Sequence, residues 1–244
     1  MKLFADYHTH TVYSHGKGTI YENVMEAKRK GLKEIAITDH GPRHFGFGVK
    51  LYKIEKIRRE IDEINASEKD VKVLMGIEAN IISEEGDIDL PVEYLKYIDI
   101  LLVGFHYGVI PKSFKSAWRL FGLNYLGKII RFLRNRVREI NTLALIRAIE
   151  RYPVKIITHP GAKVPIDTKL LAKKAAEKGV ALEINASHGF MTVEYVKIAK
   201  REGALFSIGS DAHRPEDVGS FERAIRIAEE AGLTASDVIN ACKV

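Results

Sequence analysis

The chain has almost no cysteine and no long apolar stretch, and each absence excludes a class of protein. Cys242 is the only cysteine among 244 residues, so an internal disulfide is excluded and a reducing cytoplasm is the expected compartment. No apolar run approaches the roughly 20 residues that a membrane helix needs. Residues 1–6 run into an acid and then histidines, which is unlike a signal peptide. We therefore expect a cytoplasmic protein with no membrane partner.

Low-complexity segments, linkers and repeated sequence blocks are also missing. Hydrophobic residues make up 46% of the chain and charged residues 29%, which is typical of a globular domain and excludes bulk disorder. The length is short for two full domains, whereas parallel barrels routinely use it for one. We therefore expect residues 1–244 to form a single domain.

Acidic residues are absent between Tyr107 and Arg138, although eight basic residues occur there. These are Lys112, Lys115, Arg119, Lys128, Arg131, Arg134, Arg136 and Arg138. The whole chain has a formal net charge of +6, so acids slightly outnumber bases elsewhere. Because the basicity is confined to residues 107–138, a protein that coats nucleic acid is not favoured.

Apolar side chains recur at helical spacing within the same basic segment. They are Trp118, Phe121, Tyr125, Ile129, Phe132 or Leu133, Val137 and Ile140. This pattern favours an amphipathic crossover helix that packs on the fold, with its arginines extending into water. A lid or anion-collecting arm over the active site is an alternative, as is contact with nucleic acid or a membrane.

Short apolar runs alternate with amphipathic stretches along the whole chain. The runs are rich in Val, Ile and Leu and do not alternate with polar residues, as in strands buried on both faces. They span residues 2–5, 34–38, 71–77, 98–104, 154–158, 180–184 and 205–208. Helical patterns span residues 21–30, 50–65, 115–151, 167–178, 192–202 and 221–230, and the third is expected to break near Gly122 or Gly127. Seven strand-plus-helix units predict a parallel sheet, either doubly wound or closed.

Histidines gather where the predicted strands end. Seven of the nine follow strand ends, and the remaining two, His44 and His188, lie in loops just beyond such ends. The seven are His8, His10, His15, His40, His106, His159 and His213. The carboxyl ends of the strands form the active face of parallel barrels, and only a closed sheet brings all of them to one point. We therefore predict an α/β fold, a seven-stranded TIM-like barrel with a metal site at the carboxyl ends of its strands.

The spacing of these residues suits metal binding. His8 and His10 are two apart on an extended chain, so both imidazoles can grip one ion, and Asp211 and His213 repeat that geometry. A carboxylate such as Glu78 can bridge two ions. Seven imidazoles and two carboxylates are too many for one four-coordinate zinc, so two or three divalent ions are predicted. Taken alone, neither feature demands a metal: a pair of histidines can lie on an ordinary protein surface, and Glu78 could be a buried acid that pairs with another side chain for stability.

Two further acids stand beside these candidate ligands. Asp6 and Asp39 each neighbour a histidine of the pattern. We expect them to accept the far N–H of an imidazole and thereby fix its tautomer. Capping of a nearby helix is the alternative role.

These residues together resemble the polymerase and histidinol phosphatase (PHP) superfamily, above all its small stand-alone phosphatases with a trinuclear site. The resemblance rests on His8-Thr9-His10, His15, Thr38-Asp39-His40, Glu78, His106, His159 and Ser210-Asp211-Ala212-His213. It implies a distorted seven-stranded (β/α) barrel with zinc, manganese or iron. One ion would take His8, His10, Glu78 and Asp211, a second Glu78, His106 and His159, and a third His15, His40 and His213.

The reaction that the resemblance implies is hydrolysis of a small phosphomonoester by a metal-bridging hydroxide. Bound ions lower the pKa of water toward about 7 and neutralise charge on the phosphate. The catalytic centre would include Asp211, Glu78 and His213.

Four further residues follow predicted strands and are candidate substrate contacts: Arg43, Arg214, His188 and Asn185. A guanidinium group can bind two phosphate oxygens at once, although both arginines could instead be solvated loop charges.

Other functions remain open at this stage. A nuclease or nucleotide phosphatase of the same superfamily is the main alternative to an enzyme acting on a small phosphorylated substrate. Amidohydrolases also begin with a His-x-His strand, but they generally bridge two ions with a modified lysine after strand four, where this chain has His106. A non-catalytic metal-binding module is least favoured, because every ligand position of the pattern is filled.

Overall fold

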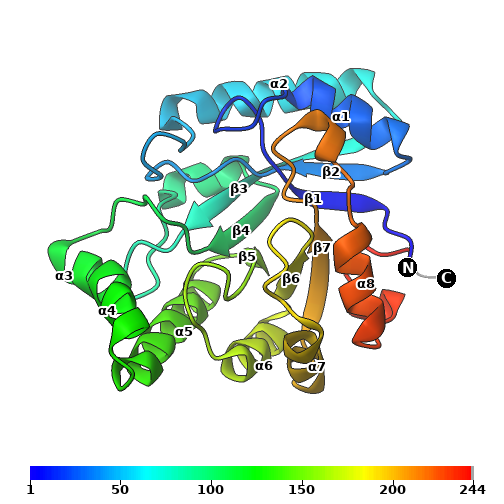
Figure 1. The fold of residues 1–244 in the computed structure, drawn as a ribbon. Coiled ribbons are helices and arrows are strands. Elements are labelled where there is room, and N and C mark those ends of the chain that lie inside the picture. Colours follow the sequence, from blue (N-terminus) through cyan, green and yellow to red (C-terminus); the bar gives the residue numbers. More distant parts are fainter. Residues whose placement is uncertain (243–244) are drawn as a thin grey trace.

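The computed structural model describes residues 1–242. Its seven strands are all parallel and follow one another around a single sheet in chain order (Figure 1). They are β1 Ala5–Thr9, β2 Glu34–Ile37, β3 Lys72–Asn80, β4 Ile100–Gly104, β5 Val154–Ile157, β6 Ala181–Asn185 and β7 Leu205–Gly209. The seven predicted strands are confirmed, with β1 beginning where the predicted run ended and β3 continuing to Asn80.

The sheet closes between β1 and β7, which lie side by side in Figure 1. A parallel bridge joins Thr9 to Ala212, and the amide of His10 donates to the carbonyl of Ala212 at 2.8 Å. Nearer the amino end of β1, the buried side chain of Asn240 lies at the junction of β1 and β7, which we call the seam. It donates to the carbonyls of Ala5 and Ile208, both at 2.8 Å. The closed alternative is therefore correct, and the fold is a TIM-like barrel.

Helices cover the outside of the barrel. They are α1 Ile20–Arg29, α2 Ile54–Ser67, α3 Phe114–Ala117, α4 Leu123–Ile129, α5 Leu133–Arg151, α6 Thr168–Lys178, α7 Val193–Arg201 and α8 Glu222–Glu230. Helix α2 shows why they pack there: Ile54, Ile57, Ile61 and Ile64 are buried along one face, which is the spacing of an amphipathic helix. Among the described residues, no helix is both long enough and apolar enough to cross a bilayer.

A bulge in β1 decides which of its side chains face the barrel interior. The pairing of β1 with β2 shifts register between Asp6 and Thr9, and one extra residue reverses the faces that later side chains take. Tyr7 therefore joins an inner apolar cluster built from several strands, while His8 is also turned toward the centre. The inner cluster fills the barrel beneath the site.

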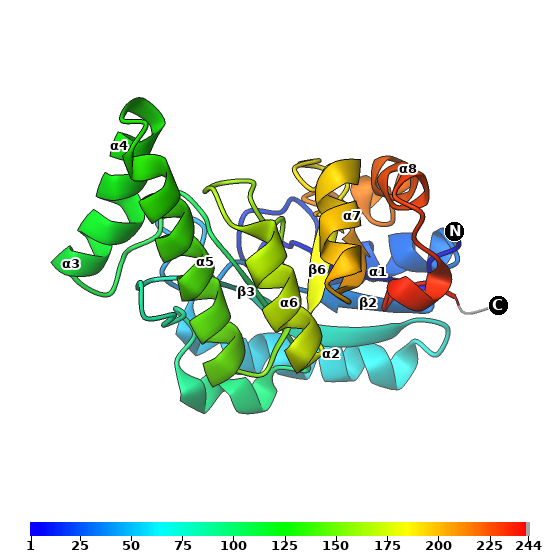
Figure 2. The same cartoon turned by 90° about the horizontal axis from the view of Figure 1, so that it is seen from below.

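Residues 113–132 form an arm beside the barrel. It contains α3, a π-helical turn at Trp118–Gly122 and α4, and Figures 1 and 2 show α3 and α4 projecting at one edge next to α5. The arm is joined to α5 by paired hydrogen bonds between the side chains of Asn124 and Asn141 at 2.9 and 3.0 Å. Gly127 packs against Val137.

One expectation for this segment is confirmed and another is wrong. The helix breaks near Gly127, as expected: α4 ends at Ile129, and Ile130 is extended. The apolar stripe does not pack on the barrel along its length, because Trp118, Tyr125, Ile129 and Phe132 are 57–80% exposed. The reason is that other side chains attach the arm: Leu120 is buried in the core, the Ser116 hydroxyl donates to Glu84 Oε2 at 2.8 Å, and Asn124 and Gly127 contact α5, so the exposed rings of the stripe face solvent.

Candidate metal centre

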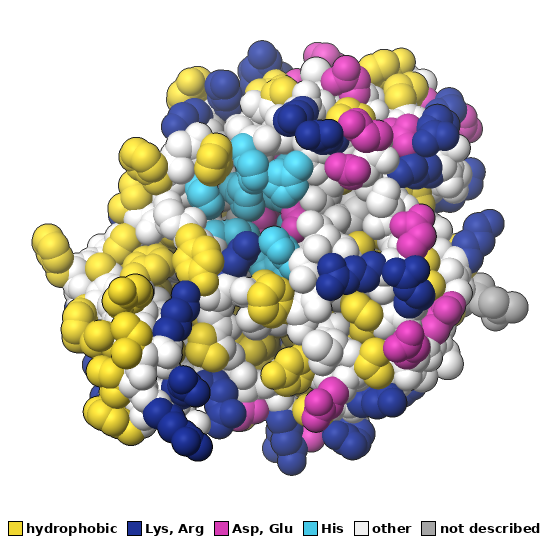
Figure 3. All heavy atoms as spheres, viewed as in Figure 1, with side chains coloured by type: hydrophobic (Ala, Val, Ile, Leu, Met, Phe, Trp, Pro, Cys, Tyr) yellow, Lys and Arg dark blue, Asp and Glu magenta, His cyan; other side chains and the backbone are white. Residues whose placement is uncertain are grey.

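The histidines converge in a hollow at the carboxyl ends of the strands. This histidine hollow has a volume of about 410 Å³, and Figure 3 shows it as a cluster of histidine side chains over buried acidic groups. It is lined by His15, His40, His44, Phe47, His106, Tyr107, His159, Lys163, His188, Asp211 and His213. Beneath this lining lie His8, His10 and Glu78, all 1% exposed or less.

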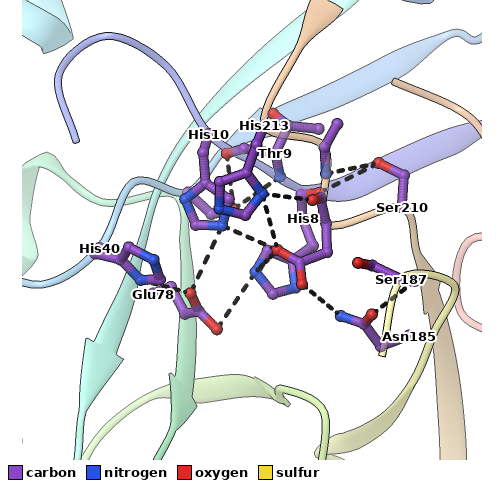
Figure 4. A network of polar contacts seen from close by, with 12 residues as sticks. His8, Thr9, His10, His40, Glu78, Asn185, Ser187, Ser210 and His213 are labelled. Carbon is purple, nitrogen blue, oxygen red and sulfur yellow. Dashed lines mark hydrogen bonds and ion pairs between the residues drawn. The ribbon is translucent and has the colours of Figure 1, made fainter. Parts of the chain in front are cut away.

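Glu78 is the centre of the arrangement. Its Oε1 lies 2.9 Å from His159 Nε2, 3.2 Å from His106 Nε2 and 3.3 Å from His8 Nε2. Its Oε2 lies 2.9 Å from His40 Nδ1 and 3.7 Å from His10 Nε2. Figure 4 shows this carboxylate among the surrounding imidazoles. The two oxygens thus face different sets of nitrogens, as a bridging carboxylate must.

Asp211 occupies the β7 side of the hollow. Its Oδ1 lies 3.3 Å from His10 Nε2 and 3.5 Å from His8 Nε2. Its Oδ2 accepts a hydrogen bond from Asn185 Nδ2 at 3.2 Å and lies 3.4 Å from His188 Nε2. Asn185 therefore orients the Asp211 carboxylate, and His188 borders the hollow without belonging to the inner group.

The third predicted set also comes together. The ring centroid of His15 lies 4.8 Å from that of His40 and 4.2 Å from that of His213. His213 donates Nδ1–H to the carbonyl of Asp211 at 2.8 Å, which leaves its other nitrogen as the available donor atom.

The donor set fits metal ions. Four groups of three residues have ligand atoms within 4.8 Å of one another: His8, His10 and Asp211; His8, Glu78 and His159; His40, Glu78 and His106; and His10, His40 and His213. Within the described residues, several buried polar atoms of this set have no hydrogen-bond partner, namely His8 Nε2, both ring nitrogens of His10, His15 Nδ1, His40 Nδ1 and Glu78 Oε2. His40 Nδ1 and Glu78 Oε2 lie 2.9 Å apart without forming a hydrogen bond. Since orphaned buried polar atoms are costly, a cation bound among them would give them the partner they lack.

The electrostatics of the pocket keep both acids ionised. Burial by itself would raise the pKa of Glu78, but the imidazoles of His106 and His8 outweigh burial and hold the pKa well below its usual range. Burial likewise opposes ionisation of Asp211, and His8 and His10 lower its pKa. Burial and the neighbouring His40 lower the pKa of His10 well below its usual value. His8 differs, because Glu183, Glu78 and Asp211 outweigh burial and raise its pKa well above its usual value. Since divalent cations bind ionised carboxylates and neutral imidazoles, the two acids and His10 are in the binding form, whereas His8 would release its Nε2 proton to a metal ion.

Partners that the sequence did not reveal hold two of the imidazoles. His8 donates Nδ1–H to Glu183 Oε1 at 2.6 Å, and His106 donates Nδ1–H to Asn80 Oδ1 at 2.7 Å. Each contact fixes the tautomer that turns Nε2 into the hollow. Glu183 lies two residues before Asn185 on β6 and therefore on the same face of the strand. This shared face was the one feature of the sequence that could have indicated that Glu183 faces the site.

Asp6 and Asp39 have other partners than those expected. Asp6 accepts from the Ser210 hydroxyl at 2.5 Å and the Gly219 amide at 2.9 Å, and Asp39 accepts from Thr11 and Ser14. In the described part of the chain neither accepts from an imidazole ring, so the expected tautomer-fixing role is wrong. Both acids instead tie together the loops that carry the histidines.

Neither Arg43 nor Arg214 is among the residues that line the histidine hollow. Arg43 lines a neighbouring cavity with Asp89, and Arg214 is in an exposed turn after His213. Their contact with a substrate stays a prediction, without support from this placement. The cation that does line the hollow is Lys163, whose Nζ lies 3.5 Å from His188 Nε2; it follows β5 in a loop that sequence reasoning did not single out.

Two residues of the centre have strained backbones. His159 has φ 27° and Asp211 has φ 58°, a region that non-glycine residues seldom adopt. Such strain persists where the surrounding structure enforces it and is concentrated at functional sites.

Known proteins resemble this chain in sequence and in fold. The PHP domain family model matches residues 6–187. A Shewanella frigidimarina protein named "Probable phosphatase" is 38% identical over 256 residues, which cover 98% of this chain and 90% of that protein. Probable phosphatase TTE1963 of Caldanaerobacter subterraneus is 38% identical over 251 residues, with 98% and 88% covered.

A solved structure shares the fold. Histidinol phosphate phosphatase from Lactococcus lactis, complexed with zinc, L-histidinol and phosphate, aligns with a TM-score of 0.61 at 16% identity, over 96% of this chain and 95% of that one. The match of the family model over most of the chain, together with these relatives, shows that the chain belongs to the PHP domain family.

Proposed function

We propose that this protein is a metal-dependent phosphatase that hydrolyses small phosphomonoesters. The observation that carries the proposal is the convergence of imidazoles and two ionised carboxylates on one hollow, with orphaned nitrogens turned inward. The names of the relatives, which include probable phosphatases, support the same reaction class.

The proposed ligands fall into three sets. His8, His10, Glu78 and Asp211 would hold one ion, Glu78, His106 and His159 a second, and His15, His40 and His213 a third. The groups of ligand atoms that lie within reach of one another overlap these sets without matching them: His8 also joins Glu78 and His159, and His10 takes the place of His15 beside His40 and His213. The mixture of imidazole and carboxylate donors suits zinc, manganese or iron. When bound, such ions lower the pKa of water and neutralise charge on a phosphate ester.

The chain's own residues would orient the ligands and the substrate. In the proposed catalytic group of Asp211, Glu78 and His213, Asn185 holds the carboxylate of Asp211, and the carbonyl of Asp211 accepts from His213 Nδ1–H. Glu183 holds the Nδ1–H of His8, whose Nε2 lies beside Glu78, so these side chains are preorganised. The Lys163 ammonium and the His188 ring border the hollow, and we propose that both donate to phosphate oxygens. Arg43 and Arg214 would contribute only through movement of their loops.

The test combines metal analysis with a substrate panel. Purified protein is analysed for bound metals and assayed with phosphomonoesters, a labelled oligonucleotide and carbon esters. Glu78→Gln is expected to lose bound metal and at least about 100-fold in kcat/KM, because one neutral oxygen cannot replace a bridging carboxylate. Exposed Glu93→Gln is the matched control and should behave as wild type.

Other results would redirect the proposal. Cleavage of the oligonucleotide in preference to every monoester would favour a nuclease, and turnover of carbon esters alone would favour an amidohydrolase-like enzyme. A fully metallated protein without turnover on any class would leave only a metal-binding role.

A further inference from the structure

A second cavity opens directly beside the histidine hollow. It has a volume of about 620 Å³ and shares two lining residues, Tyr107 and Lys163, with the hollow. We call it the side groove. Because the two cavities meet at these side chains, a molecule with its phosphate in the hollow can extend its other end along the side groove. The volume is within the range of small-molecule sites.

The walls of the side groove are aromatic and apolar. They include Tyr107, which follows β4, Phe190, which precedes α7, and Tyr195, which lies in α7. These three rings are 54%, 49% and 46% exposed, so each is partly accessible. Flat side chains that remain accessible in one groove favour a flat apolar part in the ligand.

The charge in the side groove is positive and largely unpaired. Lys128 and Arg138, from the basic segment, and Lys163 line it, and in residues 1–242 none of the three forms an ion pair with a carboxylate. The remaining cation, Lys169, lies 3.8 Å from Glu202. The acid in the lining, Asp167, has its carboxylate engaged as the cap of α6, accepting from the Leu170 amide at 3.0 Å.

The cationic wall is held in place by contacts with the loop after β5. Lys128 Nζ lies 5.6 Å from the ring centroid of Tyr107, a cation–π distance. The Tyr107 hydroxyl donates to the carbonyl of Lys163 at 2.7 Å. The side groove is therefore built from segments distant in sequence that contact one another, and part of the basic segment faces it.

We propose that the side groove binds the leaving group of the substrate, and that this leaving group carries a flat apolar part and a second negative charge. The inference rests on the proposed phosphatase function, because it places the scissile phosphate in the histidine hollow. The second anion would pair with Lys128 and Arg138, while the apolar part lies between the rings of Tyr107, Phe190 and Tyr195.

Two matched esters test the proposal. One is the phosphate monoester of a phenol that carries a propionate side chain, and the other is its propionamide counterpart, which has the same ring and leaving oxygen without the distal charge. Wild type is expected to prefer the propionate about tenfold in kcat/KM, because a hydrogen bond to a charged group is worth about one order of magnitude. The preference should appear as a lower KM for the propionate with an unchanged kcat, because the distal contact is equally strong in the bound substrate and in the transition state.

Variants then locate the contact. Lys128→Gln and Arg138→Gln should each abolish most of the preference, by raising KM for the propionate much more than KM for the propionamide. Arg131→Gln removes the same charge from an exposed position outside the side groove and should keep the preference. Equal kcat/KM for the two esters in wild type, or an equal loss in Arg131→Gln, would overturn the inference.

A binding experiment separates this inference from the proposed function. The non-hydrolysable phosphonate analogues of both esters are titrated calorimetrically into metal-loaded protein. Tighter binding of the propionate analogue, lost in Lys128→Gln, supports the side groove even if neither ester turns over. Equal affinity refutes it even if both esters are hydrolysed. A preference for a terminally phosphorylated oligonucleotide over the propionate ester would also refute it, since the occupant would then be a nucleic acid.

Discussion

At the scale of single residues, the candidate metal ligands depend on side chains that never face the ion. Glu183 takes the Nδ1–H of His8 and also accepts from the amide of His159 at 2.7 Å. It therefore holds ligands from two strands at once. Asn80 holds His106 in the same way, and Asp89 in turn accepts from the amide and side chain of Asn80 at 2.8 and 2.6 Å.

Glu183→Gln is expected to weaken metal binding by about 10- to 100-fold, because the amide cannot offer two acceptor oxygens to its buried donors. The measurement is metal retention during dialysis against buffered free zinc or manganese, with kcat/KM as a second readout. Exposed Glu230→Gln is the control. Unchanged retention in Glu183→Gln would show that His8 needs no partner at Nδ1.

Asp89 predicts a pH effect on stability. Burial raises its pKa to about 6, although Asn80 and the Arg43 amide donate to it. The folded protein thus binds this proton more tightly than the unfolded chain, whose pKa is near 3.8. Protonation of Asp89 therefore contributes its full stabilisation at pH values below the pKa in the unfolded chain. This stabilisation is lost as the pH rises through the pKa in the folded protein.

The free energy of unfolding is therefore expected to lose a contribution from Asp89 between pH 4 and about 6. Urea unfolding across this range checks it by comparing wild type with Asp89→Asn, which should be less stable overall and lack this part of the slope. Asp217→Asn, an exposed change, should keep the wild-type slope. Identical slopes in wild type and Asp89→Asn would contradict the assignment.

At the scale of elements, the long loop after β3 is fixed to helix α5. The side chains of Arg147 and Arg151 donate to the carbonyls of Glu84 and Glu85 at 2.6 and 3.0 Å. Gly86 sits at the contact with φ 78°, and an added Cβ would lie 2.6 Å from the backbone nitrogen of Ala148. The helix thus constrains the loop through backbone proximity as well as hydrogen bonds.

Replacing this glycine should separate strain from packing. Gly31 has a similar φ of 76° but open space around it, so Gly31→Ala should cost only the backbone strain, about 1 kcal/mol. Gly86→Ala should cost about 1–3 kcal/mol more, because α5 must also shift. Chemical denaturation of both variants measures the difference. Equal losses would mean that α5 does not constrain the loop.

At the scale of the whole molecule, one buried side-chain amide closes the part of the β1–β7 junction that lies below the Thr9–Ala212 bridge. Asn240 donates to Ala5 and Ile208 carbonyls and accepts from the Ile208 amide at 3.1 Å. Its side chain therefore replaces backbone pairing where β1 and β7 do not reach each other directly.

Asn240→Ala would leave three buried backbone groups without partners, so it should cost about 3 kcal/mol or more. Denaturant unfolding measures the loss, and faster hydrogen exchange of the Ile208 amide would localise it to the seam. Exposed Asn135→Ala, on α5, should change stability by no more than about 0.5 kcal/mol. A small effect of Asn240→Ala would show that water can take over its contacts.

The sequence by itself determined the seven strands, the parallel sheet and the convergence of the histidines. Strand periodicity is a local property, and residues that follow parallel strands must share one face of a barrel. Local signals also fixed the amphipathic face of α2. They failed in the arm, where Tyr125 and Phe132 have helical spacing but nothing to pack against.

Only the tertiary structure decided which partners complete the site. The bulge in β1, the positive φ of Asp211 and the contact of Glu183 with His8 arise between strands far apart in the chain. The pairing of the side groove with the histidine hollow likewise depends on Tyr107 meeting Lys163. Residue type and spacing limit which groups can reach a common point, but the packing of distant segments sets each tautomer, each orientation and each unpaired charge.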